Sequence, residues 1–140
     1  MNDKTFHVEI VTPRGEAFSG DAVMVALPGV MAPFQVLVHH APIMSQLGLG
    51  MIRIIDEHNK ETRFATSGGF MEMNHNRMTV IVESIESALD IDVARAESAF
   101  ARAQEHIRNL RNGHETSIDL ARAQEALARA TNRLKVAGKM

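Results

Sequence analysis

The sequence predicts an α+β protein in which an N-terminal β-sandwich, or a flattened barrel of the same strands, is followed by a C-terminal antiparallel two-helix hairpin. Short apolar runs of strand length recur roughly every ten residues in the first part of the chain, with turn residues between them. From Ile91 onward the apolar residues follow the three-and-four spacing of a helix. The charge changes at the same point, because residues 1–90 carry a net charge of −5 and residues 91–140 a net charge of +3. We therefore expect a β-sandwich domain at 1–87 and a helical hairpin at 88–140.

Strands are predicted where apolar and polar residues alternate and turn residues stand at both ends. Phe6–Val11 alternates in this way and ends before Pro13. Asp56–Glu61 and Asn74–Asn76 are polar segments suited to hairpin turns, the second because asparagine tolerates positive φ. A further short segment begins at Phe18, and the remaining strand-like runs are Ala22–Leu27, Phe34–Val38, Met51–Ile55, Thr62–Thr66, Phe70–Met73 and Met78–Val82.

Capping residues define the two helices. Asp90 is suited to cap the first helix ahead of Ile91, and Asp92 places a carboxylate in its first turn, where the helix dipole favours negative charge. Gly113 is a typical end for this helix. The second helix is expected to begin with a cap at Thr116 or Ser117 and to end near Val136, before Gly138.

The apolar seam of the two helices is narrow. Five of its twelve residues are alanine, and burying one methyl group contributes only about 0.8 kcal/mol. Helices of this length are marginal in water without packing partners. We expect a weakly held hairpin that is able to leave its docking place, although an alanine seam also suits close helix approach in a static hairpin. The seam consists of Val93, Ala96, Phe100, Ala103, Ile107 and Leu110, then Leu120, Ala123, Leu127, Ala130, Leu134 and Ala137.

Composition argues against several classes of protein. No apolar run approaches the roughly 20 residues that span a bilayer, and the first residues do not resemble a secretory leader, so a soluble chain is expected. The absence of cysteine excludes a disulfide framework. The chain has no Trp or Tyr to stack on bases, and its acidic body disfavours nucleic acid, so no nucleic-acid partner is expected. The basic helical end instead favours an acidic protein surface or a phosphate.

The helices carry two rows of arginine that suggest a nucleotide site. Arg95 and Arg102 lie seven residues apart on the first helix, and in a closed hairpin they would converge with a similar row on the second. Guanidinium groups suit phosphate, and the carboxylates of Glu86 and Asp92 could accept hydrogen bonds from a base or ribose. The alternative is a solvated face with local pairs such as Asp92–Arg95, Arg122–Glu125 and Glu125–Arg129. The second row consists of Arg122, Arg129 and Arg133.

No catalytic centre and no metal site are predicted. The serines sit in no nucleophile motif, and the 7 histidines show no metal-ligand spacing. His39 and His40 are adjacent, and on a continuous strand their side chains would point to opposite faces. We therefore expect a protein that is not an enzyme and that requires no cofactor.

Seven segments, in the same order along essentially the whole chain, resemble the epsilon subunit family of the F-type ATP synthase. They are VTPRG at 11–15, HAP at 40–42, GMIRI at 50–54, SGGF at 67–70, MTVIVES at 78–84, IDVARA at 91–96 and ARATNRLKVA at 128–137. One stretch departs from the family. Many members read GELGILPGH before AP, whereas residues 32–40 here read APFQVLVHH. Contact residues of other members are therefore not carried over to this loop.

The resemblance implies a non-catalytic rotor subunit of the central stalk, built from a sandwich of about ten short strands and a mobile hairpin. In this family the sandwich contacts the gamma subunit and the c-ring, and it helps to couple proton flow to ATP synthesis. The extended hairpin meets the beta and alpha subunits, where its basic helix inhibits ATP hydrolysis. The implied location is the cytoplasmic face of the bacterial plasma membrane, peripheral and held by the complex, which the sequence does not separate from a thylakoid.

The resemblance also implies an ATP-binding site with a regulatory role. In some bacterial members the folded hairpin binds ATP through a motif of Ile or Leu, Asp, two variable residues, Arg and Ala. The motif stands here at residues 91–96. By resemblance the carboxylates and the isoleucine lie near the base and ribose, and the arginines near the phosphates. The candidate ATP-binding residues are Glu86, Ile91, Asp92, Arg95, Arg102, Arg129 and Arg133.

Two other functions agree with the residues taken alone. The chain could be a free-standing nucleotide-binding sensor, or a β-scaffold whose hairpin is a static oligomerisation arm. Association with the gamma subunit would separate the rotor subunit from the sensor. Slow hydrogen exchange at 91–136, insensitive to nucleotide and to partners, would indicate the static arm.

Overall fold

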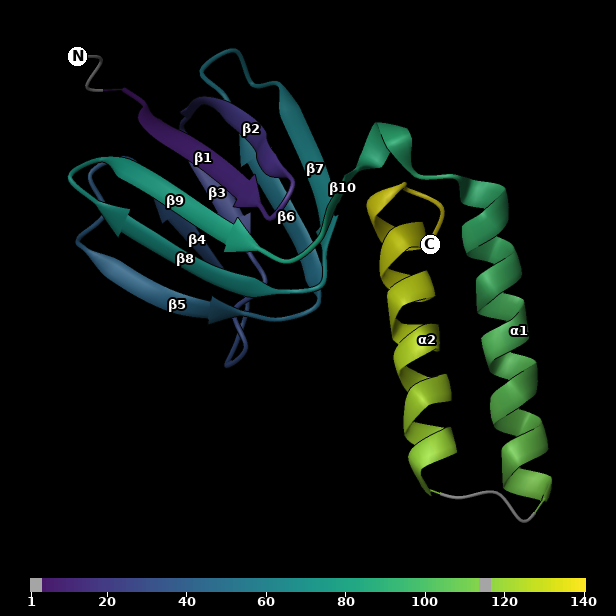
Figure 1. Cartoon of the computed structure of the whole chain (residues 1–140). Helices are drawn as coiled ribbons and strands as arrows, with labels where there is room; N and C mark the ends of the chain where they lie inside the picture. The colour runs from purple at the N-terminus through teal and green to yellow at the C-terminus, as the bar shows by residue number, and fades with distance from the viewer. Residues whose placement is uncertain (1–3, 114–116) are drawn as a thin grey trace. The chain divides into compact units, whose positions relative to one another are not determined.

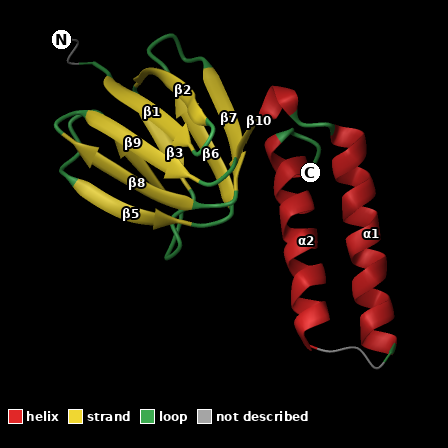
Figure 2. Cartoon of the chain, in the orientation of Figure 1, coloured by secondary structure: helices red, strands yellow, loops and turns green. Residues whose placement is uncertain are grey.

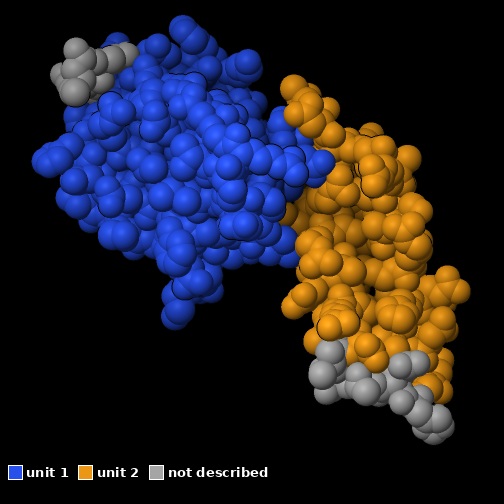
Figure 3. All heavy atoms as spheres, viewed as in Figure 1, with its two compact units in different colours: residues 1–87 blue, residues 88–140 orange. Residues whose placement is uncertain are grey.

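The computed structural model describes residues 4–113 and 117–140. The chain divides into two compact units, Met1–Ser87 and Ala88–Met140 (Figure 3). The first contains strands and the second contains helices (Figure 2). The predicted fold class, a β-sandwich followed by a two-helix hairpin, is confirmed.

Ten strands occur in the described part of the first unit, arranged as two sheets of five (Figure 1). One sheet has the order β2-β1-β9-β8-β5 and the other the order β10-β7-β6-β3-β4. All pairings between named strands are antiparallel except that of β1 with β9, which is parallel. The strands are β1 (Phe6–Thr12), β2 (Gly15–Ala22), β3 (Met24–Leu27), β4 (Phe34–Leu37), β5 (Ile43–Leu47), β6 (Gly50–Ile55), β7 (Glu61–Thr66), β8 (Gly69–Asn74), β9 (Arg77–Val82) and β10 (Ile85–Ser87).

One apolar core fills the space between the sheets. Alternate residues of each strand face inward, so that Phe6, Val8 and Ile10 of β1 are almost fully buried. The chain has only 6 Phe and no Trp or Tyr, so methionine fills much of the core volume. The buried methionines are Met71, Met73 and Met78. The opposite sheet contributes Val25, Leu27, Val36, Ile52, Ile54 and Phe64.

Two hairpin turns follow the predicted chemistry. Between β8 and β9, His75 and Asn76 have φ values of 49° and 61°, as a two-residue turn with both central residues at positive φ requires. Between β6 and β7, an Asp56 carboxylate oxygen accepts hydrogen bonds from the backbone N–H groups of His58 and Lys60, each at 2.9 Å. The bond from Lys60 is the main cause that lowers the pKa of Asp56 below its usual value.

Glycine is required at the entrance to β8. Gly68 has φ +117°, and a Cβ at this position would lie 2.6 Å from the carbonyl oxygen of Leu47. At Gly69 a Cβ would lie 2.0 Å from the carbonyl oxygen of Ile81. The Gly68-Gly69 pair therefore allows β8 to enter its sheet in close backbone contact with both neighbours.

Several strand boundaries differ from the predictions. Strands β5 and β10 were not predicted, and the run Ala22–Leu27 is divided at Val23 between the end of β2 and the start of β3. The predicted strand Phe34–Val38 ends at Leu37, and His39 adopts φ 63° in a turn. The histidine pair therefore does not lie on a continuous strand, and the argument from opposite faces does not apply.

The second unit is a hairpin of two helices, α1 (Val93–Asn112) and α2 (Ser117–Val136), preceded by a short 3-10 helix, η1 (Ala88–Asp90). Every predicted seam residue is buried or half-buried. One cluster joins Ile107 and Leu110 of α1 to Ala123 of α2, with Leu120 and Leu127 packed against it. The pairing of late α1 residues with early α2 residues makes the helices antiparallel.

The helix ends agree only in part with the predicted caps. Asp90 lies in η1, and the cap of α1 is Asp92, so the predicted cap is two residues too early. Gly113 follows α1 as predicted, and α2 ends at Val136. At this end Gly138 has φ 80°, its N–H donates to Lys135 O at 3.0 Å, and the Lys139 N–H donates to Leu134 O at 2.8 Å, which together form a Schellman motif. The predicted caps at Thr116 and Ser117 lie outside the side chains that are described.

Neither α1 nor α2, nor any other helix in residues 4–113 and 117–140, combines the length and apolar character needed to cross a bilayer.

The position of two isoleucines relative to the core predicts very different effects of their substitution on the free energy of unfolding. Ile52→Ala removes a side chain with no exposed surface and should lower the free energy of unfolding by about 2–5 kcal/mol. Ile81→Ala, at a side chain that is 56% exposed, should change it by about 0.5 kcal/mol or less. Urea unfolding of the full chain measures both, and equal destabilisation by the two variants would contradict the sandwich core described above.

Candidate functional site

The candidate ATP-binding residues are divided between the two units. Glu86 lies on β10 of the first unit and is half-buried. Ile91 is 8% exposed and stands in the short segment between η1 and α1. Arg95 and Arg102 lie on α1, and Arg129 and Arg133 lie on α2. Six of the seven predicted residues therefore lie in the second unit, either on its two helices or in the segment just before α1.

Asp92 has a structural task at the start of α1. Its backbone is extended, and one carboxylate oxygen accepts a hydrogen bond from the backbone N–H of Arg95 at 3.1 Å. This is the geometry of an N-cap, which satisfies one of the free N–H groups of the first helical turn. The second carboxylate oxygen is not needed for this cap, so Asp92 can serve the helix and still present an acceptor to a ligand.

Each candidate arginine directly precedes a buried seam residue. Arg95 stands before Ala96 and Arg102 before Ala103 on α1. On α2, Arg129 and Arg133 stand in the same way before Ala130 and Leu134. A residue is turned by about 100° from the one that follows it in a helix, so all four arginines lie to the same side of their seam.

This common position places the four arginines on one face of the hairpin. Two antiparallel helices are related by a two-fold axis perpendicular to the plane that they span, so equivalent positions on the two helices face the same side. Arg95, Arg102 and Arg129 are exposed and Arg133 is half-buried. Four of the five arginines in the two predicted rows therefore lie on one face of the hairpin, and their convergence on a ligand stays a prediction.

The charges on this face are only partly compensated. Arg129 lies 3.9 Å from Glu125, an exposed pair one helical turn apart that contributes little to stability. Arg95 and Arg102 form no ion pair with any residue in the described part of the chain. Uncompensated guanidinium groups on one surface repel each other, and a bound phosphate would relieve that repulsion.

The opposite face of the hairpin contains a cavity that the sequence did not predict. Its volume is about 440 Å³, and Ile107 and Leu127 supply its apolar part. Polar residues from both helices line the rest, namely Gln104, Arg108, Arg111, Asn112 and Gln124. None of the candidate ATP-binding residues lines it. The predicted site and the cavity are therefore distinct features of the second unit.

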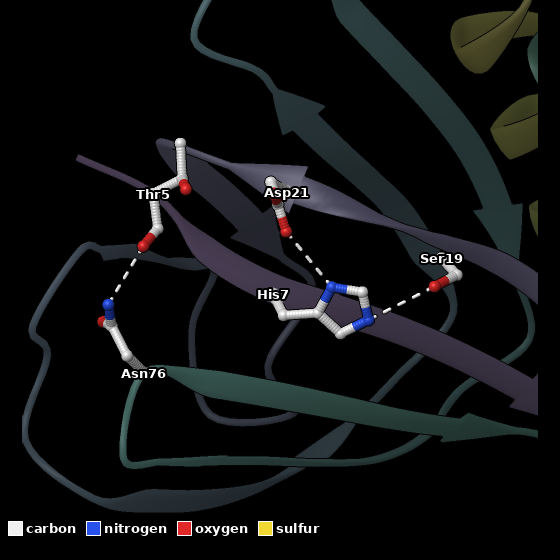
Figure 4. Close-up of polar contacts among 5 residues, drawn as sticks. All are labelled: Thr5, His7, Ser19, Asp21 and Asn76. Atoms are coloured by element: carbon white, nitrogen blue, oxygen red, sulfur yellow. Dashed lines mark hydrogen bonds and ion pairs between the residues drawn. The ribbon is translucent and has the colours of Figure 1, made fainter. Parts of the chain in front are cut away.

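The sequence also did not predict a row of three polar side chains on the sandwich, formed by Ser19, His7 and Asp21 (Figure 4). The His7 ring lies 3.1 Å from an Asp21 carboxylate oxygen through Nδ1 and 3.2 Å from Ser19 Oγ through Nε2. The order of contacts is that of a catalytic triad, but the Asp21 side chain is 63% exposed, whereas a triad depends on a buried carboxylate to orient the imidazole. We assign the row to cross-strand pairing of β1 with β2. Beside it, the Asn76 side-chain amide donates to Thr5 O at 3.0 Å.

A patch of apolar side chains is exposed on the outer face of the sheet that contains β8 and β9. Phe70 of β8 lies directly opposite Ile81 of β9, and the two are 57% and 56% exposed. Met44 of β5, 73% exposed, lies on the same face. Neighbouring exposed apolar side chains of this size are typical of a protein-binding surface. We call these three residues the outer apolar patch.

No group of three or more potential metal ligands lies close together in residues 4–113 and 117–140.

Comparison with protein families matches both units. Residues 5–88 match the model described as "ATP synthase, Delta/Epsilon chain, beta-sandwich domain". Residues 90–138 match the model described as "ATP synthase, Delta/Epsilon chain, long alpha-helix domain". An ATP synthase epsilon chain of Halalkalibacterium halodurans is 38% identical over 135 residues, which are 96% of this chain and 98% of the relative. One of Pelotomaculum thermopropionicum is 43% identical over 107 residues, which are 76% and 79%.

Solved structures share the fold at low sequence identity. A chain of the Euglena gracilis mitochondrial ATP synthase aligns with a TM-score of 0.81 and 15% identity, over 96% of this chain and 81% of its own length. A chain from the central stalk and c-ring of the Tetrahymena thermophila mitochondrial ATP synthase aligns with a TM-score of 0.61 and 15% identity, over 98% and 99%.

The cap geometry predicts a local effect of Asp92 that is independent of any ligand. Asp92→Ala should remove the hydrogen bond to the Arg95 N–H and destabilise the start of α1 by about 1 kcal/mol, whereas Asp92→Asn keeps a capping oxygen. Amide hydrogen exchange at residues 93–97, measured without nucleotide, should therefore speed up in the alanine variant only. Equal exchange in both variants and the parent chain would argue against the cap.

Proposed function

The chain belongs to the ATP synthase delta/epsilon chain family, and from that membership we propose that it serves as a non-catalytic rotor subunit in the central stalk of an F-type ATP synthase. In this role it couples proton-driven rotation to ATP synthesis. Residues 1–87 act as the docking domain, and residues 88–140 act as a mobile hairpin that inhibits ATP hydrolysis. The observation that carries the proposal is the match of both units, in order, to the two domains of this family.

The proposed partners of the sandwich are the gamma subunit and the c-ring. The outer apolar patch supports this role, because Met44, Phe70 and Ile81 expose apolar area that a partner would remove from water. A second exposed group, Val30 and Met31, lies in the loop before β4, and Met31 is 94% exposed. Both surfaces lie in residues 1–87, so the sandwich can bind its partners without any contribution from the hairpin. The complex would then hold the chain peripherally at the cytoplasmic face of the bacterial plasma membrane.

The proposed partners of the extended hairpin are the beta and alpha subunits. Two properties of the hairpin support movement. Much of its buried surface comes from small side chains, because Ala96, Ala103, Ala123 and Ala130 are buried and five of the twelve seam residues are alanine. Its charge is also suited to the proposed contact, since the arginine face would meet an acidic stretch of the beta subunit.

The proposed regulatory ligand is ATP, with no cofactor required. The arginine face of the hairpin supports a phosphate-binding role, and Asp92 and Ile91 stand at the entrance of α1 beside it. A ligand at one hundred times its dissociation constant stabilises the conformation that binds it by about 2.7 kcal/mol. That is comparable to the burial of a few alanine methyl groups, so ATP can bias the position of a weakly held hairpin.

Removal of the hairpin tests the regulatory role. An assembled enzyme that carries only residues 1–87 should hydrolyse ATP faster than the enzyme with the full chain, because the inhibitory element is absent. The shortened chain should still co-purify with the gamma subunit, because its docking surfaces remain. Unchanged hydrolysis in an enzyme that retains the shortened chain would refute inhibition, and loss of co-purification would refute docking through the sandwich alone.

Calorimetric titration tests the ATP site in the full isolated chain. Arg95→Gln removes an exposed guanidinium without an ion-pair partner among the described residues, so it should weaken ATP binding about tenfold while the fold is kept. Arg77→Gln, which removes an exposed arginine of β9, is the matched control and should bind as the parent chain does. Equal dissociation constants for the two variants would count against the site.

A further inference from the structure

The hairpin contains an internal sequence repeat. The hexapeptide Ile-Asp-Val-Ala-Arg-Ala at residues 91–96 recurs as Ile-Asp-Leu-Ala-Arg-Ala at residues 118–123. The similarity continues, because nine of the seventeen positions are identical when residues 91–107 are aligned with 118–134. At three of the others one apolar residue replaces another. The chain therefore carries the candidate phosphate-binding sequence twice, once in each helix.

The repeat coincides with the symmetry of the hairpin. The two helices run side by side in opposite directions (Figure 1), and the 27-residue offset of the repeat makes Arg95 correspond to Arg122 and Arg102 to Arg129. His106 takes the position of Arg133. Like the four candidate arginines, Arg122 and His106 each stand directly before a buried seam residue, Ala123 and Ile107. All six basic side chains therefore lie on one face, which we call the basic face.

The centre of the basic face belongs equally to both halves. Arg102 and Arg129 correspond to each other in the repeat, and both stand near the middle of their helices. Arg95 and Arg133 extend the face toward the ends of the hairpin at residues 93 and 136, and Arg122 and His106 extend it toward the turn. Arg122, like Arg95, is exposed and forms no ion pair with a described residue.

We propose that the hairpin has a second anion-binding position, formed by Arg122 and His106 together with the shared Arg102 and Arg129. The repeat aligns Asp119, inside the first turn of α2, with the cap residue Asp92. The ligand of the second position is a chain of phosphate groups, either that of a nucleoside triphosphate or a free inorganic polyphosphate. Because the two positions share their central arginines, a ligand occupies one or the other and the stoichiometry is one. The inference takes the proposed ATP site as its template and extends it.

The differences between the repeats decide what the second position recognises. Glu86, the candidate partner of the base or ribose, corresponds to Gly113 when the offset of the repeat is applied, so the second position lacks this carboxylate. It therefore selects for phosphate and not for the nucleoside. His106 in the place of Arg133 offers imidazole ring nitrogens instead of a guanidinium fork, so the two positions also differ in the donors that they present to a phosphate.

Backbone amide shifts of the isotopically labelled full chain distinguish the two positions. Inorganic tripolyphosphate should shift the amides of residues 119–123 at saturation, and ATP should shift those of residues 92–96 at lower concentration. Arg122→Gln should weaken the tripolyphosphate effect at 119–123 about tenfold and leave the ATP effect at 92–96 in place. Arg95→Gln should do the reverse, and Arg77→Gln should change neither.

The outcomes separate the second position from the proposed ATP site. No shift at 119–123 with tripolyphosphate, or a shift that Arg122→Gln leaves unchanged, overturns the second position whatever happens at 92–96. Shifts at 119–123 with none at 92–96 refute the ATP site and leave the second position standing. Arg122→Lys keeps the charge and should retain part of the binding, and circular dichroism shows whether each variant keeps its helices.

Discussion

The apolar layer between the two five-stranded sheets is the interaction on which the rest of the structure depends. A hairpin of two twenty-residue helices with a seam rich in alanine buries too little area to be stable alone in water. The sandwich has no such shortage, because Phe6, Val8 and Ile10 meet Val25, Ile52 and Ile54 across a closed core. One unit therefore supplies stability and the other is free to be weakly held. That division suits the proposed role, in which the sandwich stays bound while the hairpin moves.

Physical pattern in the sequence was sufficient for most of the fold. The alternation of apolar and polar residues, together with the turn residues, predicted most of the strands. Apolar residues spaced three and four apart predicted both helices. Strand β5 was not predicted because Ser45 and Gln46 interrupt its apolar pattern. Strand β10 was not predicted because its three residues are too few to show an alternating pattern. The cap of α1 was placed at Asp90 instead of Asp92, since both are good caps and only the backbone decides between them.

The site was less accessible to sequence reasoning than the fold. The spacing of Arg95 and Arg102 showed that they share a helix face, but only the buried seam shows which side of the hairpin they occupy. The contact of His7 with Ser19 and Asp21 depends on the register of β1 against β2, which includes a β-bulge after Ile10. Strand register of this kind is set by tertiary packing, so no local pattern in residues 6–22 contains it.

The parallel pairing of β1 with β9 has a consequence for synthesis on the ribosome. Strand β1 lies between β2 and β9, and its partner residues in β9 are about seventy positions later in the chain. The first strand emerges early but cannot complete its sheet until residue 82 has left the exit tunnel. Until then β1 and β2 form an exposed two-stranded ribbon, a marginal structure with an unpaired backbone edge and an uncovered apolar face. The sandwich therefore folds late in translation, after residue 82 has emerged, and the hairpin follows it along the chain.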